Sequence, residues 1–211
     1  MIDDAPVNDT AQRSFLFLLA SSRRDGNTEL LARRAAEQLP AGTEQRWLRL
    51  SELPLAPFVD RRHDGEGTYP QPEGHERTLL EATLAATDLV IASPLYWYSV
   101  SADAKLYLDY WAGWMRVPGY DFRARMAGKG LWAVSAGSTE DPAASDALVT
   151  TLRLSGEYLE MRWGGALLGY ANQPGRVVED EGAMARAEGF FSAVAGGARP
   201  TAAAPSGATR A

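Results

Sequence analysis

Small hydroxyl, amide and arginine side chains gather in one short segment near the start of the chain, SSRRDGNT at residues 21–28. Ser21, Asn27 and Thr28 provide hydrogen-bond donors, and Arg23 can donate charge-assisted hydrogen bonds to an anion. The segment leads directly into a helical pattern, ELLARRAAEQL, whose first turn adds unpaired backbone N–H groups and the positive end of a helix dipole. This combination indicates a site for one terminal phosphate group.

Neither of two common phosphate motifs is present in this segment, because it lacks both G-x-G-x-x-G and a G-K-[ST] ending. We expect Gly26 to lie where the backbone turns sharply and approaches a ligand closely. An ordinary strand-to-helix turn, in which Asn27 or Thr28 caps the helix, explains the same residues about equally well.

A run of three aromatic residues is the second chemical signal: Tyr96, Trp97 and Tyr98 follow the apolar segment DLVIAS, Pro94 and Leu95. Three consecutive aromatic rings in a loop are unfavourable unless they cover a flat apolar group. Burial under a neighbouring loop or against a dimer partner is the simpler alternative. Further along, the segment from Ser135 through Gly137 to residue 139 offers hydroxyl and backbone donors that suit the polar rim of a ring, although a plain Gly/Ser turn explains it almost as well.

The elements that must position these loops alternate along the chain. Short apolar runs typical of strands buried on both faces lie at 14–20, 45–50, 88–93, 130–136 and 163–170. Helical patterns lie at 28–39, 75–86, 101–114, 142–160 and 180–195, the fourth beginning with Asp141 as N-cap and Pro142 in the first helical position. The alternation predicts an α/β fold, a doubly wound five-stranded parallel sheet with helices on both faces. Ligands of such sheets bind beyond the carboxyl ends of the strands.

One domain is expected, from residue 14 to residue 195. Residues 1–13 lack periodicity and residues 196–211 are rich in Gly, Ala, Pro, Ser and Thr, so a disordered N-terminal arm and a disordered C-terminal tail are expected. The segment 51–74 is long and rich in Pro and Gly. Connections of that length are usually functional or part of an interface.

Composition excludes several classes of function. With 27 acidic and 21 basic residues, a formal charge of −6 and a pI near 5.0, the chain lacks the basic surface that nucleic-acid binding requires. It has no cysteine and only two histidines, which excludes thiolate chemistry and iron–sulfur clusters, and no metal site is expected. No apolar run approaches the roughly 18 residues of a membrane span, and the polar start is unlike a signal peptide. A cytoplasmic protein is expected.

Together, the two loops resemble those of the flavodoxin-like NAD(P)H-dependent FMN reductases, a family that includes quinone and azo-dye reductases. The G-S-x-R-x-x-G-N-T loop of that family is matched by residues 20–28, with Ala20 in place of the opening glycine. Its S-P-x-Y-[WF] segment is matched by residues 93–97. Its following S-x-x-x-K-x-x-x-D pattern is matched by Ser101, Lys105 and Asp109, although Tyr110 stands where an arginine is common. The resemblance extends over about residues 14–195.

The resemblance implies non-covalent FMN, with its phosphate on Ser21, Arg23, Asn27 and Thr28. It implies an isoalloxazine ring against Pro94, Leu95, Tyr96, Trp97 and Tyr98, with donors near Ser135 and Gly137. It further implies NAD(P)H as co-substrate and a small-molecule electron acceptor such as a quinone, a flavin or an azo compound. Because the cofactor supplies the chemistry, no catalytic side chain is expected. Lys105 and Asp109 are expected to form only an i, i+4 ion pair on a helix.

A homodimer is also predicted, on two grounds. One is the long segment 51–74, and the other is a set of aromatic residues expected to be exposed: Tyr96, Trp97, Tyr98, Tyr107, Tyr110, Trp111 and Trp114. In the resembling family the partner subunit often helps to enclose the flavin site.

Two other functions remain open at this point. A flavodoxin-type electron carrier would dock through acidic loops, whereas residues 94–101 carry no charge and residues 114–129 are net basic. A basic rim suits a nucleotide phosphate better than a cationic partner, although a solvated loop explains the basic residues about as well. A flavin-free dimeric module that keeps only the fold is the third possibility. The retained phosphate loop argues against it.

Overall fold

A computed structural model of the chain describes residues 13–192. The predicted arm and tail lie outside these residues except for Arg13, and so do the last three residues of the helix predicted over 180–195. Arg13 belongs to the fold rather than to an arm, because its guanidinium is bonded to the buried side chain of Asp88.

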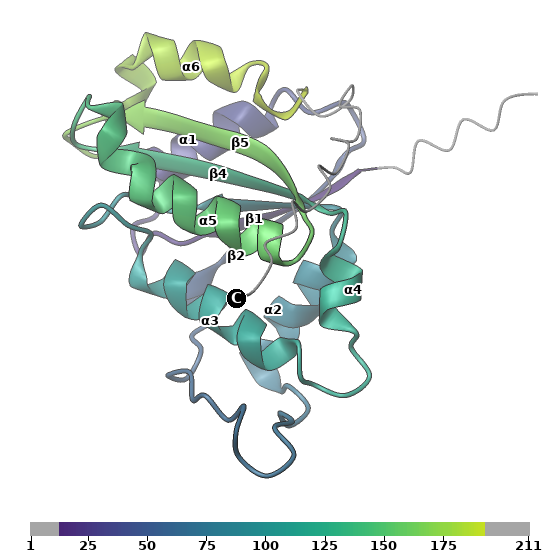
Figure 1. The fold of residues 1–211 in the computed structure, drawn as a ribbon. Coiled ribbons are helices and arrows are strands. Elements are labelled where there is room, and N and C mark those ends of the chain that lie inside the picture. The colour runs from purple at the N-terminus through teal and green to yellow at the C-terminus, as the bar shows by residue number, and fades with distance from the viewer. Residues whose placement is uncertain (1–12, 193–211) are drawn as a thin grey trace, which may run out of the picture.

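One five-stranded sheet organises the described residues, with all neighbouring strands parallel and in the order β2-β1-β3-β4-β5 (Figure 1). The strands are β1 (Ser14–Leu19), β2 (Glu44–Arg49), β3 (Asp88–Ala92), β4 (Gly130–Gly137) and β5 (Arg162–Tyr170). This order is that of flavodoxin-like folds, and it reverses direction between β1 and β3. The predicted fold class and all five predicted strands are confirmed.

Helices cover both faces of the sheet (Figure 1). One face carries α1 (Asn27–Ala36) and α6 (Glu181–Ala187), and the other carries α2 (Gly74–Ala85), α3 (Ala102–Trp114), α4 (Phe122–Met126) and α5 (Asp146–Tyr158). The one-turn helix α4 was not predicted, because five residues are too few to show a helical period.

Short 3₁₀ turns divide two of the predicted helices. The pattern at 142–160 begins as a 3₁₀ turn, Pro142–Ser145, before α5, and Asp141 caps it as predicted by accepting a 3.0 Å hydrogen bond from the Ala143 amide. The pattern from 180 onward is α6 followed by a 3₁₀ turn at Phe190–Ser192, and another 3₁₀ turn, Arg176–Glu179, precedes α6.

Alternate residues of the strands enter two separate cores. Leu16 and Leu18 of β1 pack toward the face covered by α2 to α5, whereas Phe15 and Phe17 pack toward α1 and α6. All four side chains are buried. Each contributes roughly 1.5–3 kcal/mol of hydrophobic free energy, so the continuous apolar run of β1 is what a strand covered on both faces needs.

Trp132 explains the first of the two consecutive glycines of β5, Gly164 and Gly165. The Trp132 ring is fully buried on the α1 and α6 side of the sheet, and the pairing of β4 with β5 shifts beside it. A Cβ atom on Gly164 would lie 2.3 Å from that ring. Only glycine leaves room for the indole at this position.

A buried charged cluster closes the amino-terminal edge of the sheet. Asp88, the first residue of β3, is fully buried, and its Oδ1 atom lies 2.7 Å from Nη2 of Arg13. Its carboxylate also accepts hydrogen bonds from Trp132 Nε1 at 3.0 Å and from Thr87 Oγ1 at 2.8 Å. Burial raises the pKa of Asp88, but the hydrogen bonds from these three residues lower it more, so the carboxyl pKa lies below its usual range.

Side chains from α6 and its N-cap bond to the outer edge of β5. The main-chain N–H of Tyr170 donates to Oδ2 of Asp180 at 2.8 Å, and Arg186 donates to the carbonyl of Leu168 at 2.9 Å. Two main-chain groups near the end of this edge strand are therefore already bonded.

The long segment between β2 and α2 packs on the side of α3 that faces away from the sheet (Figure 1). Phe58 and Tyr69 lie against Gly113 of α3, and the Tyr110 hydroxyl donates to the carbonyl of Ala56 at 3.0 Å. Three aromatic residues of α3 that were expected at the surface are buried in the core between α3 and the sheet: Tyr107, Trp111 and Trp114. Their predicted exposure was wrong. Within residues 13–192, no helix combines the length and the apolar character that a bilayer span requires.

Candidate functional site

The two loops singled out from the sequence lie together at the carboxyl edge of the sheet, because β1 and β3 are adjacent parallel strands. Ser101, the N-cap of α3, joins them. Its hydroxyl donates to the carbonyl of Ala20 at 2.7 Å, and its main-chain N–H donates to Oγ of Ser93 at 2.8 Å. Ser101 belongs to the family pattern noted in the sequence, and the structure makes it the link between the loops.

Backbone N–H groups are the main feature of the 21–28 loop. Among residues 13–192, no acceptor is bonded to the amides of Ser22, Arg24 or Gly26, nor to those of Asn27 and Thr28 in the first turn of α1. Thr28 and Ser21 are buried, Oγ of Ser21 accepts from the Arg23 amide, and Arg23 is exposed. The loop thus offers unpaired donors and one free cation, as an anion site requires.

Two details of this loop differ from expectation. The residue with a left-handed backbone is Asp25, at φ 52°, whereas Gly26 has an ordinary φ of −76°. Gly26 is also the N-cap of α1, so the alternative in which Asn27 or Thr28 caps the helix is wrong. The side chain of Asn27 bonds to a different loop instead, through Nδ2 to the carbonyl of Gln173 at 2.9 Å and through Oδ1 to the amide of Val177 at 3.3 Å.

The aromatic loop is a tight two-residue hairpin turn. Tyr96 and Ser99 exchange two main-chain hydrogen bonds of 3.0 Å, and the central residues Trp97 and Tyr98 have positive φ angles of 49° and 63°. A type I′ turn needs such angles and normally uses Asn-Gly. The turn leaves Trp97 95 % exposed and Tyr98 63 % exposed. Two bulky aromatic residues held in a strained conformation at the surface indicate a functional constraint.

The end of β4 borders the same edge. Ser135 is buried, and its hydroxyl has no hydrogen-bond partner among residues 13–192. A Cβ atom on Gly137 would lie 3.1 Å from Leu95 of the aromatic loop, so glycine permits this close approach. A buried hydroxyl without a partner beside a bare backbone fits a ligand that supplies the missing hydrogen bond.

A cavity of about 1030 Å³ adjoins Gly137. It lies between the carboxyl end of β5, the loop after β4 and the segment leading into α6. Its lining includes Thr139, Tyr170, Asn172 and Arg176.

The basic segment 114–129 lies at the opposite edge of the sheet, because it precedes the first residue of β4. Arg123 pairs with Glu160 and stacks on Tyr158, and Lys129 donates to the carbonyls of Leu84 and Ala86. The prediction that these residues form a rim for a nucleotide phosphate was wrong. The Lys105–Asp109 ion pair on α3, at 2.5 Å, is present as predicted.

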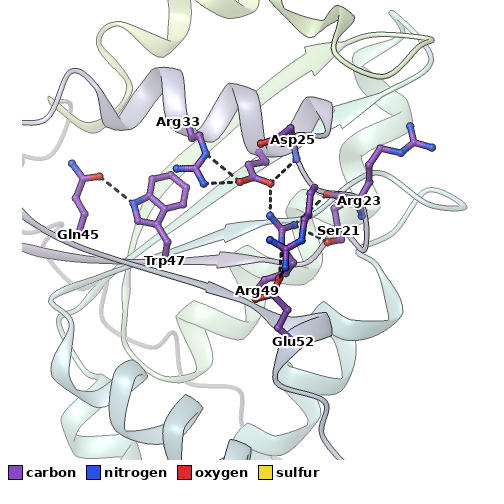
Figure 2. Close-up of polar contacts among 10 residues, drawn as sticks. Ser21, Arg23, Asp25, Arg33, Gln45, Trp47, Arg49 and Glu52 are labelled. Carbon is purple, nitrogen blue, oxygen red and sulfur yellow. Dashed lines mark hydrogen bonds and ion pairs between the residues drawn. The ribbon is translucent and has the colours of Figure 1, made fainter.

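A buried ion-pair network beneath the phosphate loop was missed by sequence analysis (Figure 2). Glu29, in the first turn of α1, is 2 % exposed and is bonded to Arg33 and Arg49. Burial raises the pKa of Glu29, but the hydrogen bonds from Arg49 and Arg33 lower it more, so the carboxyl pKa is below its usual range. One signal was available: Arg49 ends the strand beside β1, and parallel pairing places it next to the loop that follows β1. Within the described part of the chain no cluster of His, Asp or Glu side chains is suited to a metal ion.

Known proteins resemble this chain in sequence and in fold. The sequence profile of the family described as NADPH-dependent FMN reductase matches residues 14–166. A protein of Bacillus subtilis (strain 168), provisionally named NAD(P)H-dependent FMN-containing oxidoreductase YwqN, is 28 % identical over 167 residues, covering 79 % of this chain and 90 % of that protein.

Two solved structures share the fold. The Trp repressor binding protein from Bacillus subtilis has a TM-score of 0.66 at 22 % identity, covering 84 % of this chain and 97 % of that one. An FMN-dependent NADH-azoreductase from Bacillus anthracis str. Ames Ancestor, solved in complex with FMN, has a TM-score of 0.62 at 15 % identity, covering 87 % of this chain and 100 % of that one.

The profile match spans most of the chain and includes both loops of the site. The chain belongs to the NADPH-dependent FMN reductase family, the flavin-dependent oxidoreductases that its two loops resemble.

Proposed function

We propose that this chain binds FMN non-covalently at the carboxyl edge of its sheet. It accepts hydride equivalents from NADH or NADPH and passes electrons to a small acceptor such as a quinone, a free flavin or an azo compound. The observation that carries the proposal is the convergence, through Ser101, of a loop with unpaired amides and a strained aromatic turn. Family membership supports the same assignment.

Different residues of the site bind different parts of the cofactor. The amides of the 21–28 loop, the hydroxyls of Ser21 and Thr28 and the Arg23 guanidinium hold the phosphate group. Asn27 contributes its main-chain N–H, because its side chain fastens the neighbouring loop. Among these donors, Arg23 at the surface of the loop is the only charged side chain.

The ring lies against Pro94, Leu95, Tyr96, Trp97 and Tyr98, whose side chains exclude water from one side of it. Ser135 and the backbone at Gly137 offer hydrogen-bond donors to its polar edge. When bound, FMN supplies the hydride and electron chemistry itself, so this chain needs no general acid or base. The cavity beside Gly137 gives a second substrate room near the ring. A cytoplasmic location accords with this role.

An absorption spectrum tests the proposal directly. The purified protein is mixed with FMN, desalted and then treated anaerobically with NADH or NADPH. Retained flavin bands that bleach with either nucleotide are the expected result. Flavin that is retained but not bleached would indicate a flavodoxin-type electron carrier. Loss of all flavin on desalting would contradict the assignment of both loops and favour the flavin-free module.

We also propose that the chain forms a homodimer. Two groups of apolar side chains remain exposed at the surface: Tyr96, Trp97 and Tyr98 at the site, and Leu154 and Tyr158 on α5. Covering such side chains is the usual reason for a subunit interface. Light scattering at micromolar concentration should give twice the chain mass of 22.8 kDa. A mass of one chain would overturn the dimer and leave the flavin assignment intact.

A further inference from the structure

Arg49 lies directly beneath the phosphate loop although it belongs to another strand. It is the last residue of β2 and pairs in register with Leu19, the last residue of β1, so its side chain reaches the loop that begins at Ala20. The side chain is only 9 % exposed. An arginine this deeply placed must have its donors occupied.

The guanidinium contacts two carbonyls of the loop and two carboxylates outside it (Figure 2). Nη1 donates to the carbonyl oxygens of Ser21 and Arg23, both at 3.2 Å. Nη2 donates to Oε2 of Glu29 at 2.5 Å, and Nε lies 3.4 Å from Glu52. The same Glu29 oxygen accepts the Asp25 amide at 3.1 Å. Arg49 therefore holds the peptide groups 21–22 and 23–24 of the loop, and Glu29 holds the next one, 24–25.

Because the peptide group is planar and trans, each bonded carbonyl also fixes the direction of the next residue's N–H group. In a trans peptide the C=O of one residue and the N–H of the next point in opposite directions. Carbonyls of Ser21 and Arg23 that point toward Arg49 therefore make the N–H groups of Ser22 and Arg24 point away from it. These two amides are among those without an acceptor in residues 13–192.

Arg49 also offsets the negative charge of a buried carboxylate. Glu29 places a buried carboxylate in the first turn of α1, where a bound anion would be repelled. Arg49 and Arg33 lie against its two oxygens at 2.5 and 2.6 Å and offset that charge. Arg33 is half exposed, whereas Arg49 is buried with the carboxylate, so Arg49 is the more effective counter-charge.

We propose that Arg49 is the positioning residue of the phosphate loop: it turns the Ser22 and Arg24 amides toward the phosphate group and offsets the charge of Glu29. The inference rests on the proposed FMN function but concerns a residue that does not itself touch the cofactor. Lysine cannot replace it fully, because one ammonium group lacks the planar fork that holds two carbonyls and a carboxylate together.

Comparing FMN with riboflavin isolates this role, since the two ligands differ only in the phosphate group. Arg49→Met and Arg49→Lys are titrated with both flavins, and thermal unfolding of the flavin-free proteins is recorded. Arg46→Met is the matched control, because Arg46 is an exposed residue of the same strand whose side chain makes no ion pair or hydrogen bond among the described residues. In Arg49→Met the Kd for FMN should rise about tenfold or more, while the Kd for riboflavin changes less than about twofold.

Arg49→Lys should recover part of the lost FMN affinity, and Arg46→Met should leave both dissociation constants unchanged. Equal weakening of FMN and riboflavin binding would overturn the proposal, because it would indicate a merely structural role. Unchanged FMN binding would overturn it as well. If Arg49→Met does not fold, the same ratio measured in Arg49→Lys decides the question. Failure of the unsubstituted protein to bind FMN would instead refute the proposed function.

Discussion

Replacing Asp88 by alanine should lower the free energy of unfolding by about 3–5 kcal/mol, the usual cost of breaking a buried ion pair. The carboxylate is fully buried and accepts from Arg13, Trp132 and Thr87. Its removal leaves the buried indole N–H without an acceptor and the guanidinium without its counter-charge. Chemical denaturation monitored by tryptophan fluorescence measures the change.

Asp109 provides the matched control for this substitution. It is also an aspartate paired with a cation, Lys105, but both side chains are exposed. Asp109→Ala should cost less than about 1 kcal/mol, because solvent screens an exposed pair. Similar losses for Asp88→Ala and Asp109→Ala would show that burial of the Asp88 cluster adds nothing to stability.

The pH dependence of stability follows from the lowered pKa of Asp88. A carboxyl whose pKa is lower in the folded than in the unfolded state stabilises the protein above the unfolded pKa of about 3.9, and this contribution disappears as the pH falls through the folded value. The stability difference between the parent protein and Asp88→Asn should therefore be constant from neutral pH down to about pH 5 and shrink below about pH 4. A difference that grows on acidification would contradict the ionised state of Asp88.

Replacing Trp97 and Tyr98 together by Asn and Gly should stabilise the fold while weakening flavin binding. Both residues have positive φ angles, which cost about 1–2 kcal/mol each for side chains of this kind. Asn-Gly adopts the same turn readily, so the free energy of unfolding should rise by about 2 kcal/mol. Loss of the two rings should raise the Kd for FMN by about tenfold. Denaturation and flavin titration of the same protein sample measure both effects.

The double variant Trp97→Ala/Tyr98→Ala separates backbone strain from the aromatic rings. Alanine removes the rings but keeps the unfavourable left-handed backbone, so flavin binding should weaken without the gain in stability. An Asn-Gly variant no more stable than the Ala-Ala variant would refute the strain. An Asn-Gly variant that keeps full FMN affinity would remove the aromatic turn from the proposed site.

The parts of the fold that depend on local pattern were predictable. Apolar runs such as SFLFLLA give strands buried on both faces, and their alternation with helical patterns gives the sheet. The sequence also identified the two loops that the structure places together at one edge. Both follow from short-range periodicity and from the rule that parallel strands share a carboxyl edge.

The features that were missed depend on contacts between distant residues. Arg49 contacts Glu29 across 20 positions, and the basic residues after α3 lie at the other edge of the sheet because of where β4 begins. Tyr107, Trp111 and Trp114 were expected at the surface, but they are buried in the core. Thr83 of α2 is bonded to the Tyr107 hydroxyl, and the ring of Phe122 in α4 lies against both indoles. Asp25 was missed as the left-handed residue because Gly26, beside it, is the usual choice.

The bonds that α6 and its N-cap make to β5 bear on how the protein behaves in a crowded cell. An uncovered edge strand can recruit a strand from another chain and so start intermolecular sheet growth. Asp180 and Arg186 occupy the Tyr170 amide and the Leu168 carbonyl, while the opposite edge strand, β2, carries the exposed charged residues Glu44 and Arg46. The two edge strands are thus protected against pairing with strands of other chains by different means: β5 by bonded main-chain groups and β2 by charge.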